Sequence, residues 1–394
     1  MIRPFIGYGR QSIDDADIVA VIDVLKSDYL TQGPAVEQFE VALANRVGAR
    51  HAIAVSSGTA ALHLSCLAAG LGPGDVGIVP TLTFVATANA LSYCGATPHL
   101  VDVDADTLNI SPTSFDITAI DKPVKAALPV HFSGLPVNIR QLREALGEDV
   151  VIIEDACHAL GAEDIEGNII GSCSHSDMAV FSFHPVKTIT TGEGGAITTN
   201  DDKLASELRR LRSHGIERDT ERLSDDAFDN DGTLRPWYYE QQGLGYNYRM
   251  TDLQAALGLS QLAKLDGFLS RRREITSYYD MYFEDLAHVK LPQSQLILRS
   301  ISGQHLYLMS IDFDALGKNR THVMQKLRDV GIGSQVHYIP VHRHPYHCAM
   351  GEFKNEDFPV AEQHYASTLS IPLFPAMTDG DVEYVSGHIK KIFQ

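Results

Sequence analysis

The amino-acid sequence predicts an α/β protein with a large, mainly parallel sheet domain and a smaller α+β domain at its C-terminal end. Two observations lead to this fold class. Strand and helix signals alternate over about the first 250 residues, as in parallel sheets that helices cover on both faces. Long helices and scattered strands then replace this alternation. Because 394 residues exceed what one hydrophobic core usually organises, we expect two domains, at 1–255 and 256–394.

The alternation begins with a helix. Ser12 and Asp15 have the spacing of a capping box, and apolar residues follow at helical intervals. Later helices end at Gly70 and Gly95, since glycine favours helix C-termini. The expected strands are short apolar runs between the helices. We expect further helices at 35–46, between 59 and 70, and at 84–93 and 138–146, and strands near 78 and 100 and at 51–55, 126–129, 150–153, 178–183 and 196–199.

The C-terminal part begins with long helices. Residues 253–282 contain no proline and carry apolar positions at helical spacing, so they predict one or two long helices. Strand-like segments at 305–311 and 334–338 follow. Ahead of this part, residues 218–236 are polar and acidic, and we expect them to form a mobile surface loop.

The composition excludes several classes of protein. The chain carries 32 basic and 50 acidic residues, a net charge of −18, and its longest basic run is 271–273, so a nucleic-acid partner is disfavoured. Five scattered cysteines without a CxxC pair are typical of free thiols in a reducing compartment. Residues 1–5 lack the apolar core of a signal peptide, and no apolar run approaches the length that spans a bilayer, so we expect neither feature. We therefore expect a cytoplasmic protein without a membrane partner.

Lys187 lies just past an expected buried strand and before a glycine-rich turn. A single lysine after a strand is usually a solvated loop cation. Here the aromatic end of the strand buries the approach, and Gly192, Gly194 and Gly195 let the backbone pack close to a ligand. A lysine in such a partly desolvated site loses its proton more easily and can attack an aldehyde. The segment therefore predicts a nucleophilic lysine.

Asp155 and His158 follow another expected strand, at the sheet edge where open α/β sheets place ligand contacts. A carboxylate at Asp155 could keep a pyridine nitrogen protonated, so that the ring withdraws electrons. The equal alternative is that Asp155 or Glu154 caps a helix. His158 either donates to a cofactor's phenolic oxygen or is a structural histidine, and the sequence leaves both roles open.

Ser57, Gly58 and Thr59 stand at the start of an expected helix. Unpaired backbone N–H groups and the helix dipole make such a place a phosphate site, although the same residues also form ordinary helix caps. Phe84 stands at a later junction between strand and helix. Its ring could stack on an aromatic ligand, although a core position is the commoner explanation for a phenylalanine.

Taken together, these residues resemble the DegT/DnrJ/EryC1 family of sugar aminotransferases, which have the aspartate-aminotransferase architecture (fold type I). The resemblance covers essentially the whole chain and rests above all on residues 182–195 around Lys187 and on Glu154 and Asp155 ahead of His158. It implies pyridoxal 5'-phosphate (PLP) as cofactor, L-glutamate as amine donor, and a homodimer with shared active sites.

The resemblance also implies roles for individual residues. Lys187 would hold the cofactor, Asp155 would face its pyridine nitrogen, His158 would lie near its phenolic oxygen, and Phe84 would pack on its ring. The implied phosphate ligands are Gly58, Thr59 and Ser182, with Asn247 reaching over from the neighbouring subunit. Position 158 is histidine where many relatives carry glutamine, which leaves its protonation state open.

Within the family, the chain is most similar to the branch that aminates a UDP-linked 4-keto-6-deoxy-N-acetylhexosamine in the pseudaminic acid pathway. Residues 28–33, 245–249 and 335–338 carry this similarity. The implied product is UDP-4-amino-4,6-dideoxy-N-acetyl-β-L-altrosamine, and the alternative is a GDP- or dTDP-linked keto-sugar. The implied sugar-nucleotide contacts are Tyr8, Asp28, Tyr29, Leu30, Thr31, Gly58, Ser182, Asn247, Arg249, His337 and Tyr338.

Three other functions are weighed against this one. A PLP-dependent sugar dehydratase of the family would carry histidine in place of Lys187. A catalytically silent regulator would have no need of Lys187, Asp155 and the phosphate residues. A metal site is suggested by four histidines and a cysteine within residues 337–348, but their spacing matches no zinc signature and prolines interrupt the segment, so we expect no metal.

Overall fold

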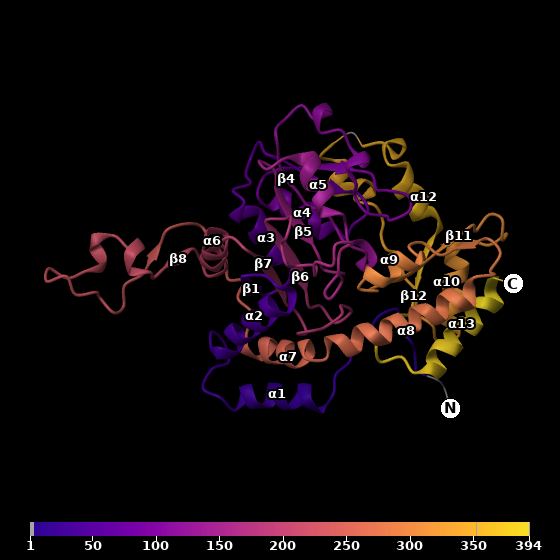
Figure 1. Cartoon of the computed structure of the whole chain (residues 1–394), viewed down its shortest axis with the longest axis horizontal. Helices are drawn as coiled ribbons and strands as arrows, with labels where there is room; N and C mark the ends of the chain where they lie inside the picture. The colour runs from indigo at the N-terminus through magenta and orange to yellow at the C-terminus, as the bar shows by residue number, and fades with distance from the viewer. Residues whose placement is uncertain (1–3, 352, 394) are drawn as a thin grey trace.

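The computed structural model describes residues 4–351 and 353–393, and its largest element is a seven-stranded sheet with the strand order β1-β7-β6-β5-β4-β2-β3 (Figure 1). Strand β7 runs antiparallel to both of its neighbours, and the other adjacent pairs are parallel. The predicted α/β class with a mainly parallel sheet is therefore confirmed. The strands are β1 (His51–Val55), β2 (Val76–Pro80), β3 (Thr97–Val101), β4 (Val124–Ala127), β5 (Val151–Asp155), β6 (Met178–Ser182) and β7 (Gly195–Thr199).

Helices cover both faces of this sheet, because its strands carry apolar side chains on both sides. In β1, Ile53 and Val55 belong to one buried cluster, and Ala52 and Ala54 belong to another. The first cluster includes residues of α3 (Gly58–Ala68), α4 (Val85–Tyr93) and α6 (Asp202–Arg212). The second includes residues of α2 (Pro34–Val47), α7 (Asp252–Leu262) and α8 (Leu265–Phe283). Helix α5 (Ile139–Leu146) packs in a third cluster with β4 and β5 residues.

Helix α1 (Asp15–Leu25) starts from a different cap than the sequence predicted. Asp14 is the N-cap and forms the capping box with Asp17, so the prediction of Ser12 and Asp15 is wrong. The side chains of Gln261 and Lys264 donate to the Asp17 carboxylate at 2.8 and 2.6 Å. These contacts, from Gln261 in α7 and from Lys264 just ahead of α8, hold the buried Asp17 side chain at the start of α1.

A second, three-stranded antiparallel sheet lies in the C-terminal part, with the order β10-β11-β12. It packs against the end of α8, and the N-terminal residue Ile6 belongs to the same buried cluster. The expected division at residue 255 falls inside α7 and stays a prediction. The elements of this part are β10 (Val289–Lys290), α9 (Leu296–Ile301), β11 (Tyr307–Ile311), α10 (Arg320–Asp329), α11 (Pro345–Cys348), α12 (Pro359–Ser367), β12 (Thr368–Ile371) and α13 (Asp379–Phe393).

The strand expected at 334–338 is wrong. Within that segment only Gln335 pairs with the sheet, through two backbone hydrogen bonds with Ser370 of β12. The chain then leaves the sheet edge, and His337 and Tyr338 line a cavity instead. The strand-like appearance of this segment therefore reflects residues such as His337 that are buried at a site, rather than a place in a sheet.

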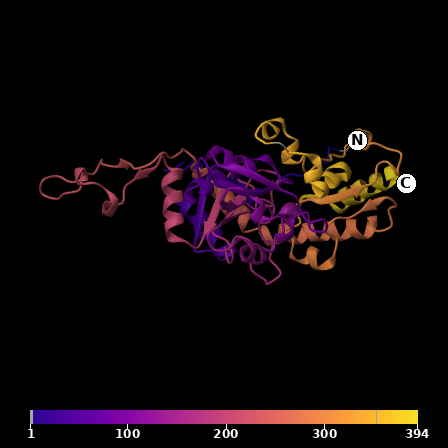
Figure 2. The same cartoon turned by 90° about the horizontal axis from the view of Figure 1, so that it is seen from above.

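Residues 216–241, which we call the arm, project away from the rest of the molecule (Figures 1 and 2). Strands β8 (Ile216–Glu217) and β9 (Glu240–Gln241) pair at its base. The sequence predicted a surface loop here, and the structure shows a surface hairpin whose Ser224 donates to Glu240 at 2.5 Å. In the part of the chain that the structure describes, no helix combines the length and the apolar character needed to cross a membrane.

Candidate active site

A cavity of about 350 Å³ lies at the carboxyl ends of several strands of the large sheet. The turns that follow β1, β2, β5 and β6 all contribute to it, as does the segment at 337–338. It brings together ten of the residues that the sequence suggested: Tyr8, Gly58, Thr59, Phe84, Asp155, His158, Ser182, Lys187, His337 and Tyr338.

The start of α3 forms one end of this cavity. Ser57 is the N-cap, and its Oγ accepts from the backbone N–H of Ala60 at 3.1 Å. The first N–H groups of a helix have no acceptor within the helix, and here they lie at the cavity together with the Ser182 side chain. A Cβ at Gly58 would lie 2.9 Å from the Ser182 Cβ, so glycine is needed for this close approach. The arrangement suits a phosphate group.

Lys187 lies in the turn between β6 and β7. Its backbone N–H donates to the His184 carbonyl at 2.8 Å, and Phe183 exchanges backbone hydrogen bonds with Gly194 and Thr191 at the base of the turn. The three glycines have different surroundings: a Cβ at Gly194 would meet the side chains of Thr191 and Met250, whereas Gly192 has no neighbour within 4 Å and a φ of +81°. Their closeness to a ligand stays a prediction. A Cβ at Gly195 would lie 2.5 Å from the Ser57 backbone, so glycine lets the lysine turn and the start of α3 touch.

The environment of Lys187 favours its neutral amine. Burial lowers the pKa of the Lys187 ammonium below its ordinary value, and the nearby charge of Asp155 opposes this shift without reversing it. A lysine whose pKa is lowered in this way has a larger fraction of nucleophilic amine near neutral pH.

Asp155 is the last residue of β5, and its carboxylate lies in the cavity wall. Its Oδ2 accepts from Thr87 Oγ1 at 2.7 Å, and its Oδ1 accepts from the backbone N–H of Cys157 at 3.2 Å. Residues 156–177 are all described and contain no helix, so the alternative role as a helix cap is wrong. A carboxylate has about four acceptor positions, which leaves Asp155 able to accept from a bound ligand as well.

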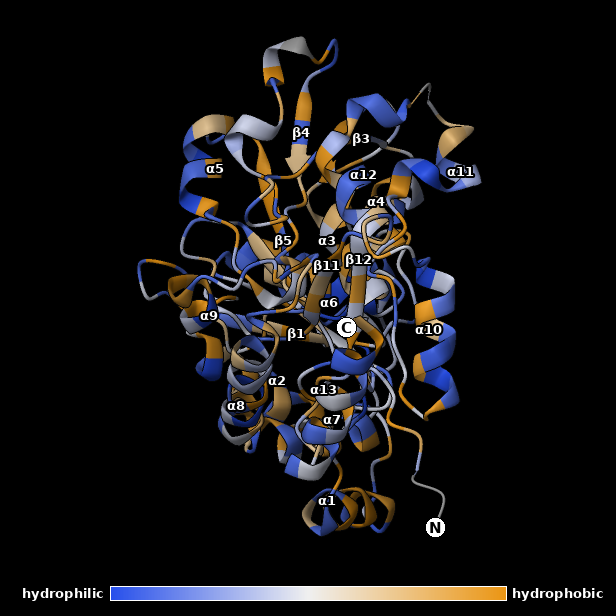
Figure 3. Cartoon of the chain, turned by 90° about the vertical axis from the view of Figure 1, so that its right-hand side faces the viewer, coloured by the Kyte–Doolittle hydropathy of each residue, from blue (hydrophilic) through white to orange (hydrophobic). Residues whose placement is uncertain are grey.

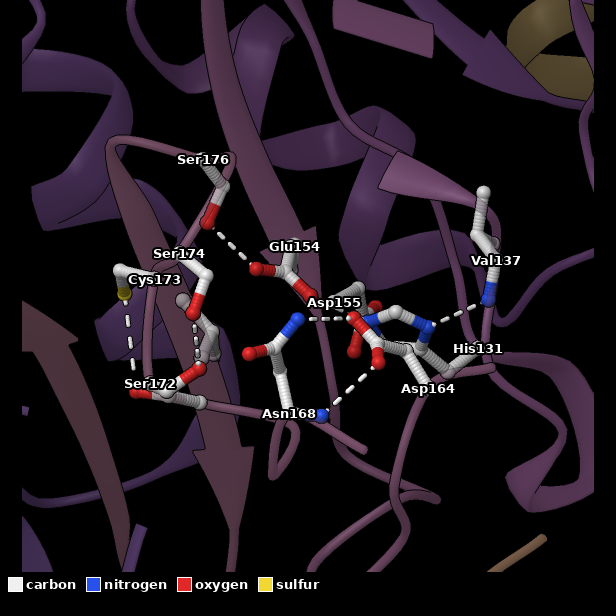
Figure 4. Close-up of polar contacts among 12 residues, drawn as sticks. His131, Val137, Glu154, Asp155, Asp164, Asn168, Ser172, Cys173, Ser174 and Ser176 are labelled. Carbon is white, nitrogen blue, oxygen red and sulfur yellow. Dashed lines mark hydrogen bonds and ion pairs between the residues drawn. The ribbon is translucent and has the colours of Figure 1, made fainter. Parts of the chain in front are cut away.

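Glu154 points to the opposite face of the sheet from its neighbour, as successive strand residues do (Figure 4). It is buried, and His131 Nε2 lies 2.7 Å from its carboxylate. The Val137 backbone N–H donates to His131 Nδ1 at 2.9 Å, so the ring proton is on Nε2 and is donated to Glu154. Ser176 Oγ donates to the other carboxylate oxygen. Glu154 is therefore a structural residue outside the cavity.

His158 is held between aromatic groups. Its Nε2 lies 3.1 Å from the Tyr338 hydroxyl, and its ring centroid lies 4.2 Å from that of His305. Burial lowers the pKa of His158 well below its ordinary value, and the positive charge of Lys187 acts in the same direction. His158 is therefore neutral. Its buried Nδ1 has no partner among the described protein atoms.

The remaining wall of the cavity is aromatic. Phe84 is 57% exposed, so it is not a core residue, and its ring lies 6.0 Å from that of Tyr338. The ring of Tyr8 lies 5.2 Å from that of His337. His337 Nδ1 is 2.8 Å from Ser370 Oγ, and burial lowers the pKa of His337 to about 3, so this imidazole is neutral too.

Some expected site residues lie outside this cavity. Asn247 is exposed, and its neighbours Tyr246 and Tyr248 stack on each other with ring centroids 5.0 Å apart. Arg249 pairs with Val55 in a backbone bridge. The other four expected contacts are exposed and lie in the segment ahead of α2, at Asp28, Tyr29, Leu30 and Thr31. A single chain does not bring these six residues to the site.

Sequence reasoning overlooked several residues that the structure places at or beside the cavity. Thr87 donates a hydrogen bond to Asp155, and the His305 ring packs against that of His158. Both come from distant parts of the chain. Cys157 and Glu193 lie next to motif residues and line the cavity, so proximity to the motifs was a signal for both. A hydroxyl in the first turn after Phe84 was the only signal for Thr87, and no sequence signal marked His305.

The histidines at 337–348 have separate partners. His342 contacts Thr81 Oγ1 and Glu362, His347 contacts Asn89, and His337 contacts Ser370. Among residues 4–351 and 353–393, no three histidine, cysteine or acidic side chains gather in a way that could hold a metal ion.

The residues of the cavity fit PLP. The start of α3 offers N–H donors for a phosphate, and the Asp155 carboxylate can accept from a ring nitrogen. The unpartnered Nδ1 of His158 can meet a phenolic oxygen. Lys187 lies in the same cavity as these three groups, where its amine can reach an aldehyde.

Comparisons with known proteins give a consistent result. Residues 11–390 match the DegT/DnrJ/EryC1/StrS aminotransferase family. The spore coat polysaccharide biosynthesis protein SpsC of Bacillus subtilis is 40% identical over 98% of this chain and 97% of its own length.

Two solved structures are also similar to this chain. One is Helicobacter pylori PseC, an aminotransferase involved in the biosynthesis of pseudoaminic acid, which is 28% identical with a TM-score of 0.86 over 99% of both chains. The other is Streptococcus pneumoniae Spr1654 in its PLP form, which is 28% identical with a TM-score of 0.85 over 98% of both chains.

Proposed function

Because the chain belongs to the DegT/DnrJ/EryC1/StrS aminotransferase family, we propose that it moves an amino group from L-glutamate to a nucleotide-linked keto-sugar. The protein is a PLP-dependent aminotransferase with the fold type I architecture. We propose as its acceptor the C4 ketone of a UDP-linked 4-keto-6-deoxy-N-acetylhexosamine. The product would be UDP-4-amino-4,6-dideoxy-N-acetyl-β-L-altrosamine, a precursor of pseudaminic acid.

One observation supports a sugar rather than a keto acid as acceptor. None of the described residues that line the cavity is an arginine, whereas a second carboxylate is best recognised by a paired guanidinium. Tyr8, His337 and Tyr338 offer hydroxyl and imidazole groups instead. Such groups suit sugar hydroxyls and an N-acetyl group. The similarity to PseC supports the proposed branch.

The residues of the cavity divide the chemistry between them. When bound, PLP supplies an aldehyde that combines with amines and a pyridine ring that takes up the electrons left when a carbon loses its proton. Lys187 Nζ takes the proton from the α-carbon of glutamate, and in the second half-reaction it delivers a proton to the sugar carbon. Asp155 holds the proton on the ring nitrogen, and the N–H groups at the start of α3 bind the phosphate.

We further propose a homodimer in which each site receives residues from both subunits. Asn247 is exposed in its own chain, where its backbone pairs with Ser213 ahead of the arm, and its side chain can therefore reach a second copy. The arm carries exposed apolar side chains, including Trp237, which is 72% exposed. Helix α1 also exposes apolar residues, visible as orange bands at the edge of Figure 3, among them Ile18, Val19, Ile22 and Leu25. Exposed apolar groups of this kind are typical of protein interfaces.

Hybrid dimers test the shared site. Lys187→Ala and Asn247→Asp should each be inactive alone, the second because its carboxylate would repel the phosphate. A hybrid of the two contains one wild-type site, so an equal mixture that exchanges subunits freely should recover about a quarter of wild-type activity. The measurement is turnover after the two variants are unfolded and refolded together.

The control mixes Lys187→Ala with Asp155→Ala. Both residues line the cavity of one chain, so every site in that hybrid carries a defect and no activity should return. Equal recovery in both mixtures, or full activity in a monomer, would contradict the shared site.

The acceptor is tested by comparing kcat/KM for UDP-, GDP- and dTDP-linked 4-keto-sugars and for oxaloacetate, with L-glutamate as donor. We expect the UDP-linked N-acetylhexosamine to be preferred over oxaloacetate by about 100-fold or more, because oxaloacetate would leave the hydroxyl and imidazole groups of Tyr8, His337 and Tyr338 without the sugar partners that we propose for them. Mass spectrometry and NMR identify the aminated sugar. A preference for a GDP- or dTDP-linked sugar would replace the acceptor but keep the reaction, and a preference for oxaloacetate would contradict both.

A further inference from the structure

The carboxylate of Asp155 is held by a side chain from another helix. Thr87 lies in the first turn of α4, and its Oγ1 is 2.7 Å from Asp155 Oδ2. Both residues are buried, and Thr87 has no exposed surface. Water therefore does not compete for this hydrogen bond, and a hydrogen bond to a charged group in such a place is stronger than one at the surface.

The direction of this hydrogen bond follows from the groups around Thr87. An ionised carboxylate only accepts, so the single hydroxyl proton of Thr87 goes to Asp155 rather than to the more distant Phe84 carbonyl at 3.3 Å. Thr83 Oγ1 lies 2.9 Å from Thr87 Oγ1 and can donate to it. The result is a buried chain of donors from Thr83 through Thr87 to the carboxylate.

The same helix also carries the aromatic wall of the site. Phe84 is the N-cap of α4 and stands at the cavity three residues before Thr87. Helix α4 therefore positions two groups at the site. Phe84 at its start can cover the cofactor ring, and Thr87 about one turn later holds an oxygen of the Asp155 carboxylate. On the other side of the carboxylate, the backbone N–H of Cys157 holds Oδ1.

We propose that Thr87 is a positioning residue that orients the Asp155 carboxylate toward the ring nitrogen of PLP. The inference rests on the PLP-dependent reaction stated above. Without the Thr87 hydroxyl, Oδ2 would lose its side-chain donor and the carboxylate could rotate about its own bond. Cofactor binding and proton transfer in the half-reactions would be weakened, while the residues that would contact the sugar would be unchanged.

The test replaces the hydroxyl by groups of graded similarity. Thr87→Val keeps the shape but removes the donor, whereas Thr87→Ser keeps the donor but removes the methyl group. We expect Thr87→Val to slow the half-reaction with L-glutamate, and to weaken PLP binding by the apoprotein, by about tenfold or more. Thr87→Ser should stay within about threefold of wild type for both. The dissociation constant of the keto-sugar should not change, because Thr87 does not line the sugar side of the cavity.

Two further variants make the result decisive. If Thr87→Val does not fold, Thr87→Ala takes its place, because Thr87→Ala and Thr87→Ser lack the same methyl group and differ only in the donor. Ser65→Ala removes an equally buried hydroxyl that donates to the Ala61 carbonyl within α3, and it should leave PLP affinity and turnover unchanged.

The outcomes separate this inference from the function itself. Equal PLP affinity and half-reaction rates in the serine and alanine or valine variants would overturn the role of Thr87. Loss of activity in Asp155→Asn together with normal behaviour of Thr87→Val would overturn the role of Thr87 alone. A normal rate in Asp155→Asn would instead count against the proposed chemistry of the whole site.

Discussion

Lys187→Ala is expected to reduce transamination by more than roughly 10⁴-fold, since it removes both the amine that binds the cofactor and the group that moves the proton. The fold should persist, because Lys187 lies in a turn whose backbone hydrogen bonds do not depend on its side chain. Burial lowers the pKa of Lys187, so a larger fraction of this amine is neutral than of an ordinary lysine amine in solvent at the same pH.

Three measurements check this prediction: turnover with L-glutamate, the visible absorbance of bound PLP, and circular dichroism of the fold. The matched control is Lys203→Ala, which removes an exposed lysine in the first turn of α6 and should leave all three unchanged. A Lys187→Ala protein that transaminates at the wild-type rate would show that another group holds the cofactor.

Asp155→Asn is expected to have the second largest effect, lowering turnover by roughly 10²- to 10³-fold. Asparagine has nearly the same shape but no charge, so it cannot keep a proton on a pyridine nitrogen. In the wild type, the backbone N–H of Cys157 and the Thr87 hydroxyl donate to different oxygens of Asp155. Asparagine has only one side-chain oxygen, so one of these donors loses its acceptor and the side chain also loses its fixed orientation. Some PLP should remain bound through its phosphate.

Glu154→Gln is the control for this change, because Glu154 carries the same kind of group on the other face of β5. It should lower the free energy of unfolding by about 1–3 kcal/mol, since one of the donors from His131 and Ser176 loses its acceptor. The visible absorbance of PLP bound to Glu154→Gln, and the turnover of this variant, should equal those of the wild type. If Asp155→Asn also kept wild-type absorbance and turnover, Asp155 would be a structural residue like Glu154.

The sequence was most informative where a function depends on neighbouring residues. Asp155 ends β5 and Lys187 lies in the turn after β6, so the strand pattern placed both at the carboxyl ends of the strands. The same reasoning could not choose the role of Glu154, because the face to which a strand residue points depends on the register and the packing of the whole sheet.

Contacts between distant segments could not be predicted. Lys264 contacts Asp17 at the start of α1, Thr87 donates to Asp155, and His305 packs against His158. No local pattern encodes any of these contacts. A motif could suggest the roles of Asn247 and of residues 28–31. The folded single chain, however, does not bring these residues to the cavity.

The position of β7 between β1 and β6 affects how the chain can fold while it is being made. Strand β1 is an edge strand paired with β7, yet residues 56–194 separate the two along the chain. During synthesis at about 5–20 residues per second, β1 must wait for seconds before its neighbour leaves the ribosome. The lysine turn closes onto the start of α3 only through that late pairing, so the catalytic centre is among the last parts of the large sheet to be completed on the nascent chain.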